Sequence, residues 1–189
     1  PTAIMVAVGK GAKHGILIKE AATLEIANKI KTVVFDKTGT LTKGEFGVTD
    51  IILNPESGIK DPNELLKLTS SVEVQSQHSI AQGIVNDAKN KKLEIPKAAE
   101  FKSFPGKGAV GDVDNKKVTV GNKALMEELK VATDGLKIEK QTDTPVYVAI
   151  DDKLAGVILL ADIIREESKE AVRRLHDMGI KTAMLTGDT

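Results

Sequence analysis

The sequence predicts an α/β protein in which a parallel sheet is interrupted by an inserted domain of α+β type. Two apolar segments, 30–35 and 180–185, lack polar alternation, as is typical of strands buried in a parallel sheet. Between them, from about residue 45 to 156, short strands joined by tight turns accompany two or three helices, which indicates an antiparallel sheet. With 189 residues, the chain is long enough for two small domains.

The chain begins with an apolar segment, 1–10, that allows two interpretations. It is either the cut end of a longer apolar helix or a short amphipathic helix of the core. Three glycines then interrupt the pattern. We expect a short strand at 16–18 and a short helix at 20–29, where Ala, Leu and Ile recur at helical spacing.

The first buried strand ends on a carboxylate, Asp36, which Lys37, Thr38, Gly39 and Thr40 follow at once. The carboxyl ends of strands are where open α/β sheets build their sites. Gly39 permits a tight turn that brings backbone amides close to a ligand. A carboxylate in this place can attack phosphorus and form an aspartyl-phosphate. The alternative interpretation is a strand that ends in an ordinary polar turn.

Within the insert, cap and turn residues predict the elements. A strand is expected at 44–53. Asp61 is a good N-cap, with Pro62 at the first helical position and Glu64 at the spacing of a capping box. Further helices are expected at 79–91 and 123–130, and two hairpins with Asp-Asn and Asp-Asp turns at 110–113 with 117–120 and at 145–150 with 154–160.

The glycines Gly106, Gly108 and Gly111 match the Gly-x-Gly-x-x-Gly fingerprint of dinucleotide-binding proteins. That fingerprint must leave a strand and open a helix, whereas these glycines lead into a predicted hairpin, so we reject the dinucleotide interpretation. Glycines in a hairpin still allow the backbone to approach a flat or phosphate-bearing ligand closely.

The second buried strand repeats the pattern of the first. A helix at 166–178, ended by Gly179, precedes it, and its apolar positions are expected to face inward: Ala171, Val172, Leu175 and Met178. After the strand come Thr186, Gly187 and Asp188. If the two strand ends lie side by side, their hydroxyl and carboxylate groups form one polar crevice.

These motifs together resemble a known family. The segment 36–42 with 186–188 resembles the cation-pumping P-type ATPases, which are built on the haloacid-dehalogenase-like fold. Three further features resemble the heavy-metal-transporting branch of that family. They are Glu73 with His78, the Gly106-Lys107-Gly108 run with Asn122 behind it, and the segments 1–6 and 15–19, which are similar to the stretch that leaves the metal-carrying membrane helix of copper pumps.

The resemblance implies a division of the chain into four segments. Residues 1–10 would be the cytoplasmic end of a truncated membrane helix. Residues 11–44 and 157–189 would form an incomplete haloacid-dehalogenase-like phosphorylation domain, and residues 45–156 the inserted nucleotide-binding domain.

The resemblance also assigns the chemistry of the first strand end. Asp36 would attack the γ-phosphorus of ATP, with Mg²⁺ bound by Asp36 and the backbone carbonyl of Thr38. Lys37 would stabilise charge on the phosphoryl oxygens. Soluble phosphatases of this fold usually carry a second Asp where this chain has Thr38, and the missing carboxylate suits a pump whose phosphoenzyme must persist.

At the second strand end, Thr186 and Gly187 would hold the transferred phosphoryl group, and Asp188 would face the nucleotide-bound crevice. The family's later Lys-bearing motif and its Gly-Asp-Gly-x-Asn-Asp motif do not follow Thr189. We therefore expect this segment to bind ATP without turning it over.

In the insert, the resemblance implies that His78 stacks on adenine or lies against its edge, with Glu73 near the exocyclic amine. Gly106 and Gly108 would let the backbone pass close to the nucleotide, and Asn122 would complete the site. Ser79 stands where the family has proline, and a serine can cap the helix instead.

The composition of the chain argues against several classes of ligand and of structure. Lys plus Arg and Asp plus Glu are equal at 27 each and aromatic residues make up 3%, so no feature predicts nucleic-acid binding. The chain has no cysteine, which excludes a disulfide framework and a thiolate metal site within it. No apolar run is long enough to span a bilayer, and we expect the segment itself to be soluble.

The sequence thus predicts the cytoplasmic ATP-binding and phosphorylation segment of an ATP-driven heavy-metal pump of the cell membrane. Its expected ligands are ATP and Mg²⁺, and its partners are the rest of the same pump and a transported ion, expected to be copper, on helices outside this segment. Two alternatives stay open: a soluble phosphatase of the same fold, against which Thr38 argues, and a non-catalytic nucleotide-sensing module.

Overall fold

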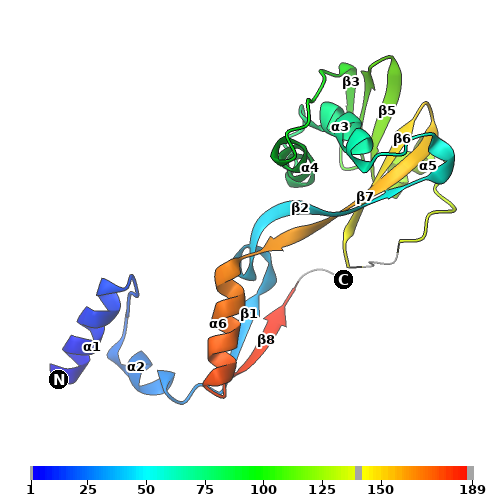
Figure 1. The fold of residues 1–189 in the computed structure, drawn as a ribbon. Helices are drawn as coiled ribbons and strands as arrows, with labels where there is room; N and C mark the ends of the chain where they lie inside the picture. Colours follow the sequence, from blue (N-terminus) through cyan, green and yellow to red (C-terminus); the bar gives the residue numbers. More distant parts are fainter. Residues whose placement is uncertain (1, 139–141, 187–189) are drawn as a thin grey trace. The chain divides into compact units, whose positions relative to one another are not determined.

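The chain forms two compact units in a computed structural model that describes residues 2–138 and 142–186 (Figure 1). One unit comprises Pro1–Leu41 with Ile164–Thr189, and the other comprises Thr42–Ile163. The predicted insert, 45–156, lies inside the second unit. The α/β class with one parallel and one antiparallel sheet is confirmed.

The second unit is built on a sheet of six strands in the order β2-β7-β6-β5-β4-β3. From β3 to β7 each pair of neighbours is antiparallel. The strands are β2 (Thr42–Leu53), β3 (Ala99–Phe104), β4 (Gly108–Val113), β5 (Lys116–Gly121), β6 (Thr144–Ile150) and β7 (Lys153–Ile164). Of these, β3 was not predicted from the sequence.

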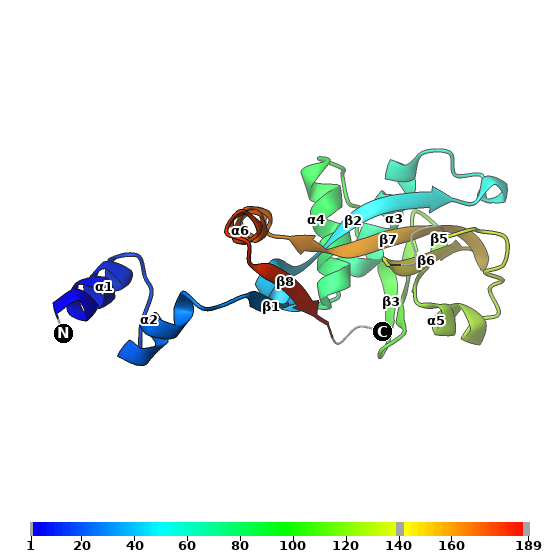
Figure 2. The same ribbon diagram turned by 90° about the horizontal axis from the view of Figure 1, so that it is seen from below.

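Helices cover both faces of this sheet (Figures 1 and 2). The helices α3 (Pro62–Glu73) and α4 (Ser79–Asn90) lie on one face, and the short α5 (Lys123–Glu128) lies on the other. Alternation along β6 shows why two layers form: Val146 and Val148 belong to the main core, whereas Ala149 packs with Met126 of α5 on the opposite side.

The predicted turns and the first predicted cap are confirmed. Asp114 and Asn115 have φ of 51° and 61°, as a two-residue hairpin turn with left-handed central residues requires. Asp61 caps α3 by accepting a hydrogen bond from the Asn63 amide at 2.9 Å. Glu64 lies in the first turn of α3, with its carboxylate 3.8 Å from the ammonium group of Lys116.

Among the described residues, the first unit contains three α-helices and a short sheet of two strands. The strands β1 (Thr32–Asp36) and β8 (Lys181–Leu185) are parallel, as predicted, and α6 (Glu166–Asp177) packs against β8. The remaining elements are α1 (Thr2–Lys13) and α2 (Ala21–Ala27). Over the ranges 2–138 and 142–186, no helix has both the length and the apolar character needed to cross a membrane.

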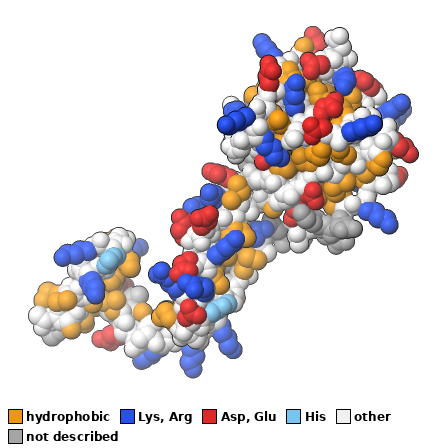
Figure 3. Space-filling model, viewed as in Figure 1, with side chains coloured by type: hydrophobic (Ala, Val, Ile, Leu, Met, Phe, Trp, Pro, Cys, Tyr) orange, Lys and Arg blue, Asp and Glu red, His pale blue; other side chains and the backbone are white. Residues whose placement is uncertain are grey.

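Four expectations for this unit are wrong. Residues 16–18 form no strand, and α1 continues through glycines that were expected to interrupt it. Neither strand is buried, and none of the helix positions expected to face inward is buried; Val34 is 54% exposed and Met178 71% (Figure 3). The physical reason is that a sheet of two strands is too small to shield many side chains from water.

Candidate functional site

The two polar strand ends predicted from the sequence meet at one edge of the short parallel sheet. The register pairs Asp36 of β1 with Leu185 of β8, so Thr186 follows directly on the neighbouring strand. Gly187 and Asp188, the other two residues expected there, lie outside the described residues.

The loop after Asp36 is a type II turn. Thr38 has φ −78° and ψ 120°, and Gly39 has φ 80° and ψ −11°, which are the central dihedrals of that turn. Only glycine takes this second position without strain. The Arg165 guanidinium donates to the Gly39 carbonyl at 3.5 Å, and the Arg165 amide donates to the Leu41 carbonyl at 3.0 Å. Sequence reasoning missed Arg165, which lies 126 residues away and ties this loop to the start of α6.

The donor chemistry of this edge fits Mg²⁺. Asp36 supplies a carboxylate on the exposed end of β1, and Thr38 supplies a backbone carbonyl two residues later in the turn. Mg²⁺ prefers such oxygen ligands and usually keeps waters or substrate phosphate oxygens for its remaining positions. One or two protein oxygens are therefore enough for a site of this kind.

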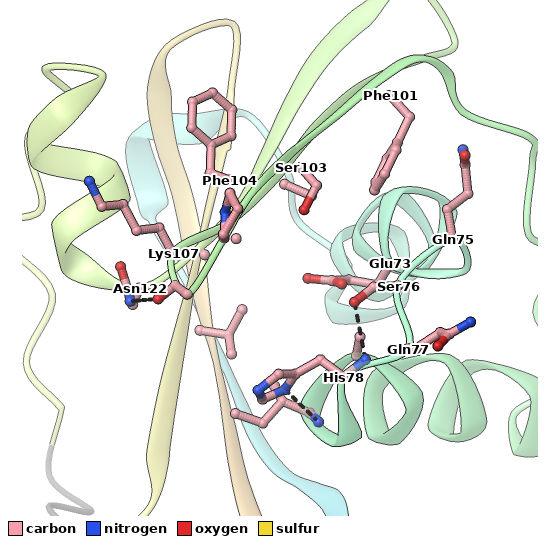
Figure 4. Close-up of a pocket in the computed structure, with 18 of the residues that line it drawn as sticks. Glu73, Gln75, Ser76, Gln77, His78, Phe101, Ser103, Phe104, Lys107 and Asn122 are labelled. Atoms are coloured by element: carbon pink, nitrogen blue, oxygen red, sulfur yellow. Dashed lines mark hydrogen bonds between the residues drawn. The ribbon is translucent and has the colours of Figure 1, made fainter.

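The second unit contains a cavity of about 390 Å³ between the α3–α4 connection and the β3–β4 loop (Figure 4). All five residues that the resemblance assigned to nucleotide binding line it: Glu73, His78, Gly106, Gly108 and Asn122. Further lining residues that sequence reasoning did not single out include Ser76, Phe101 and Phe104. The cavity combines polar groups with aromatic rings, as small-molecule sites usually do.

Glu73 is the last residue of α3, and its carboxyl group is buried, with 7% of the residue exposed. Burial disfavours the charged form and raises the pKa of Glu73 to about 7. A hydrogen bond with the Ser76 side chain acts in the opposite direction and lowers the pKa. Glu73 therefore titrates in the physiological range.

His78 caps α4, and this corrects the expectation that Ser79 would do so. The His78 Nδ1 atom accepts a hydrogen bond from the Ile80 amide at 3.3 Å, and Ser79 is the first helical residue. Because Nδ1 is the acceptor, the proton of the neutral imidazole resides on Nε2. The cap therefore holds the ring in one orientation at the cavity without the family's proline.

The two glycines of the Gly106-Lys107-Gly108 run have different roles. A Cβ on Gly108 would lie 2.1 Å from the carbonyl oxygen of Val120, so this glycine is required by the close packing of β4 on β5. Gly106 has φ +70°, and a Cβ there would meet nothing within 4 Å. Only Gly106 therefore leaves open backbone for a ligand to approach.

Asn122 holds the β3–β4 loop in place. Its amide nitrogen donates to the Gly106 carbonyl at 2.9 Å, and its carbonyl oxygen caps α5 by accepting from the Leu125 amide at 3.1 Å. Lys107 adds an ion pair with Glu128 of α5 at 2.6 Å. Asn122 thus shapes the cavity through the loop, since both of its polar atoms bond to the protein.

Comparisons with known proteins agree with this architecture. A family model described as haloacid dehalogenase-like hydrolase matches residues 30–189. The chain is 43% identical over its whole length to a probable copper-exporting P-type ATPase of Archaeoglobus fulgidus and 41% identical to a silver-exporting P-type ATPase of Salmonella typhimurium. It spans 23% of the length of each of these relatives.

A solved structure is similar to nearly the whole chain. It is a zinc-transporting PIB-type ATPase in an E2.Pi state, which superposes with a TM-score of 0.83 at 33% identity. The match covers 99% of this chain and 30% of the solved one. With a family model that accounts for most of its residues, and with relatives and a structural neighbour that are heavy-metal P-type ATPases, the chain belongs to the haloacid dehalogenase-like hydrolase family.

Proposed function

We propose that the chain is the ATP-binding and phosphorylated segment of a heavy-metal-transporting P-type ATPase. The observation that carries the proposal is the cavity of the second unit, where residues spread from Glu73 to Asn122 in the sequence line one site. These five residues, which the family resemblance links to nucleotide binding, come from α3, the start of α4, the β3–β4 loop and the start of α5.

The cavity supplies the groups that an adenine base needs. The ionised Glu73 carboxyl accepts a hydrogen bond from the exocyclic amine, and the capped His78 ring lies against the base. Phe101 and Phe104 provide apolar surface in the same cavity. The open backbone at Gly106 leaves room for the sugar and the phosphates.

Asp36 is the proposed phosphate acceptor. A carboxylate oxygen forms a bond to the γ-phosphorus of ATP while the bond to the β,γ-bridging oxygen breaks, and ADP leaves. Lys37, Thr186, Gly187 and the amides of the Gly39 turn stabilise the transferred group, and Asp188 faces the nucleotide-bound crevice. Asp36 and Thr38 would hold Mg²⁺, which neutralises charge on the phosphate oxygens.

Thr38 supports a long-lived aspartyl-phosphate. Its hydroxyl cannot act as a general acid or base near neutral pH, so no side chain two residues after Asp36 activates water for hydrolysis. The missing acid or base also disfavours a soluble phosphatase. We propose separately that this segment, which spans 23% of the length of its relatives, binds ATP but does not turn it over.

The proposed cargo of the whole pump is copper, on helices of the same protein outside this segment. Among the relatives and the structural neighbour, copper, silver and zinc are the named metals. The segment 1–6 supports copper, because it is similar to the stretch that leaves the metal-carrying helix of copper pumps. The parent protein would lie in the cell membrane, with this segment on the cytoplasmic side.

Titration of the chain with ATP and Mg²⁺, followed by amide chemical shifts, tests the proposal. We expect shifts at Glu73, His78 and Gly106, and about tenfold weaker binding in His78→Ala, because a stacked base loses its platform. His176→Ala, on α6 of the other unit, is the matched control and should bind as the wild type does.

Two results would contradict the proposal. Unperturbed amides at the cavity would exclude nucleotide binding there. Sustained phosphate release that Asp36→Asn abolishes would exclude the absence of turnover.

A further inference from the structure

The β3–β4 loop contains a charged side chain to which the sequence motifs give no role, Lys107. It stands between Gly106 and Gly108, at the position that a Gly-x-Gly pattern leaves open. Lys107 lines the cavity, and among the lining residues that the structure describes it is the one lysine or arginine. The groups proposed for the base include Glu73 and His78, whereas a nucleotide also carries a phosphate chain with several negative charges.

The backbone on which Lys107 stands is held by hydrogen bonds. The Lys107 amide donates to the Phe104 carbonyl at 2.9 Å, and the Lys107 carbonyl accepts from the Asn122 amide at 2.8 Å. The Asn122 side chain donates to the Gly106 carbonyl at 2.9 Å. The lysine side chain therefore leaves the loop from a defined point, and its ammonium group can change partner without a change in the backbone.

The present partner of the Lys107 ammonium group is a carboxylate that it can exchange. Lys107 pairs with Glu128, the last residue of α5, at 2.6 Å, and the two side chains are 45% and 44% exposed. An ion pair of that exposure adds little to stability, because water screens the attraction and two long side chains lose conformational freedom. An anion with more charge than Glu128 can therefore replace it at small cost.

Lys107 lies where the phosphates of a bound nucleotide would leave the cavity. Figure 4 shows Lys107 and Asn122 at one side of the cavity and Glu73 at the other. In the proposed pose, the base lies by Glu73 and His78, and the sugar passes Gly106, where a Cβ would meet nothing within 4 Å. Because Lys107 follows Gly106 directly, the phosphate chain comes within reach of its side chain.

We propose that Lys107 binds the phosphate chain of the nucleotide and exchanges the Glu128 carboxylate for a phosphate oxygen when the nucleotide enters. The inference rests on the nucleotide-binding function proposed above and adds a residue that distinguishes nucleotides by their phosphates. An ammonium group donates up to three hydrogen bonds and is a common phosphate ligand. Because the attraction grows with the charge of the chain, Lys107 favours ATP and ADP over AMP and adenosine.

Calorimetric titration of the wild-type chain and Lys107→Met with adenosine, AMP, ADP and ATP tests the proposal. The titrations are done without added Mg²⁺, which would neutralise part of the phosphate charge. Lys107→Met keeps a long unbranched side chain and should bind ATP about three- to tenfold more weakly than the wild type. The loss should be smaller for ADP and AMP and absent for adenosine. A merely structural role would weaken all four ligands alike.

Lys117→Met is the matched control. Lys117 also forms a half-exposed ion pair, with Asp152 at 2.9 Å. It lies near the opposite end of the β4–β5 hairpin from Gly108 and is not among the residues that line the cavity. The same change of charge at that place should leave the affinities for all four ligands within about twofold of the wild type.

Glu128→Gln tests the exchange of partners. The neutral amide holds the Lys107 ammonium group less strongly and removes a negative charge beside the path of the phosphates. ATP should therefore bind about two- to threefold more tightly than to the wild type, and adenosine equally well. An unchanged or lower affinity for ATP in this variant would overturn the exchange.

The same series separates this proposal from the proposed function. If the wild type binds ATP and Lys107→Met binds it equally well, or loses as much affinity for adenosine as for ATP, the role of Lys107 is refuted and the nucleotide site stands. If the wild type binds neither ATP nor adenosine, the nucleotide function itself fails, and the role of Lys107 fails with it.

Discussion

The two units, which contain the two halves of the predicted chemistry, differ in how many of their side chains are buried. The unit Thr42–Ile163 contains every fully buried apolar residue among those described, and its cavity lies over that core. In the unit with Asp36, the elements α1, α2, β1 and α6 contain no buried residue, and apolar side chains remain accessible (Figure 3). Packing therefore preforms the proposed nucleotide site, whereas the proposed phosphate-acceptor loop is shaped by its own turn and a few hydrogen bonds.

The physical cause is the number of layers. Six strands with helices on both faces exclude water from two layers of side chains, and each buried Leu, Ile or Val contributes about 1.5–3 kcal/mol. Two parallel strands with one helix exclude much less. The loop after Asp36 can keep its conformation without a large core, because a type II turn depends on four consecutive residues.

The largest expected effect comes from truncating one leucine in each unit. Leu66 on α3 is 0% exposed and Leu185 on β8 is 65% exposed. Leu66→Ala should lower the free energy of unfolding of the second unit by about 2–5 kcal/mol through lost burial and a cavity. Leu185→Ala should stay within about 0.5 kcal/mol.

Denaturant unfolding of the wild type and both variants, with hydrogen exchange to assign each transition to a unit, gives the measurement. Equal losses in the free energy of unfolding for the two substitutions would contradict the inferred difference in packing between the two units.

The next largest effect concerns the buried carboxyl group of Glu73. The pKa of Glu73 is about 7 in the folded chain and 4.5 when unperturbed, so between these pH values the folded state retains a proton that the unfolded state releases. Stability therefore falls as pH rises from 4.5 to 7 and stays lower above 7. Glu73→Gln should thus be more stable than the wild type above pH 7, by at most about 3 kcal/mol.

Thermal or denaturant unfolding at pH 4 and pH 8 checks this expectation, since the two proteins should differ little at pH 4, where both side chains are neutral. A variant equally stable to the wild type at pH 8 would show that Glu73 ionises freely in the fold. The same variant should bind ATP less well, so stability and function oppose each other at this residue.

The smallest effect is expected at the loop that Asn122 holds. Asn122→Ala removes the cap of α5 and the bond to the Gly106 carbonyl, with a cost of about 1–2 kcal/mol. ATP binding should weaken a few-fold because the loop loses its position, while the Glu73 titration stays unchanged. Asn122→Asp is the informative partner, since it keeps the cap oxygen but cannot donate to Gly106. If both variants bind ATP as tightly as the wild type, the loop needs no anchor.

Much of this architecture could be predicted from short stretches of sequence. The hairpin turn at Asp114 and the cap at Asp61 each depend on residues a few positions apart, and both are confirmed. The strands β1 and β8 could be recognised from their apolar runs, and their parallel pairing is also confirmed. The cap of α4 lies one residue before the predicted Ser79, because the ring nitrogen of His78 accepts the hydrogen bond, although histidine is an uncommon cap.

In the candidate site, too, some residues could be identified from the sequence and others could not. Glu73, His78 and Gly106 could be selected by motif, whereas Ser76 and Arg165 could not. Both lie outside the motifs and reach them through a hydrogen bond, Ser76 to His78 and Arg165 to Gly39. The distinction between Gly106 and Gly108 also escaped the sequence, since both fit one pattern and only the approach of Val120 separates them.

Local patterns specify where strands end, which turns form and which residues resemble a nucleotide site, because these properties are encoded within a few neighbouring residues. The burial that raises the pKa of Glu73 to about 7, the action of Asn122 through the loop, and the accessibility of β1 and β8 depend on the folded arrangement. Burial and steric closeness depend on groups that meet across tens of residues of chain, and only folding brings those groups together.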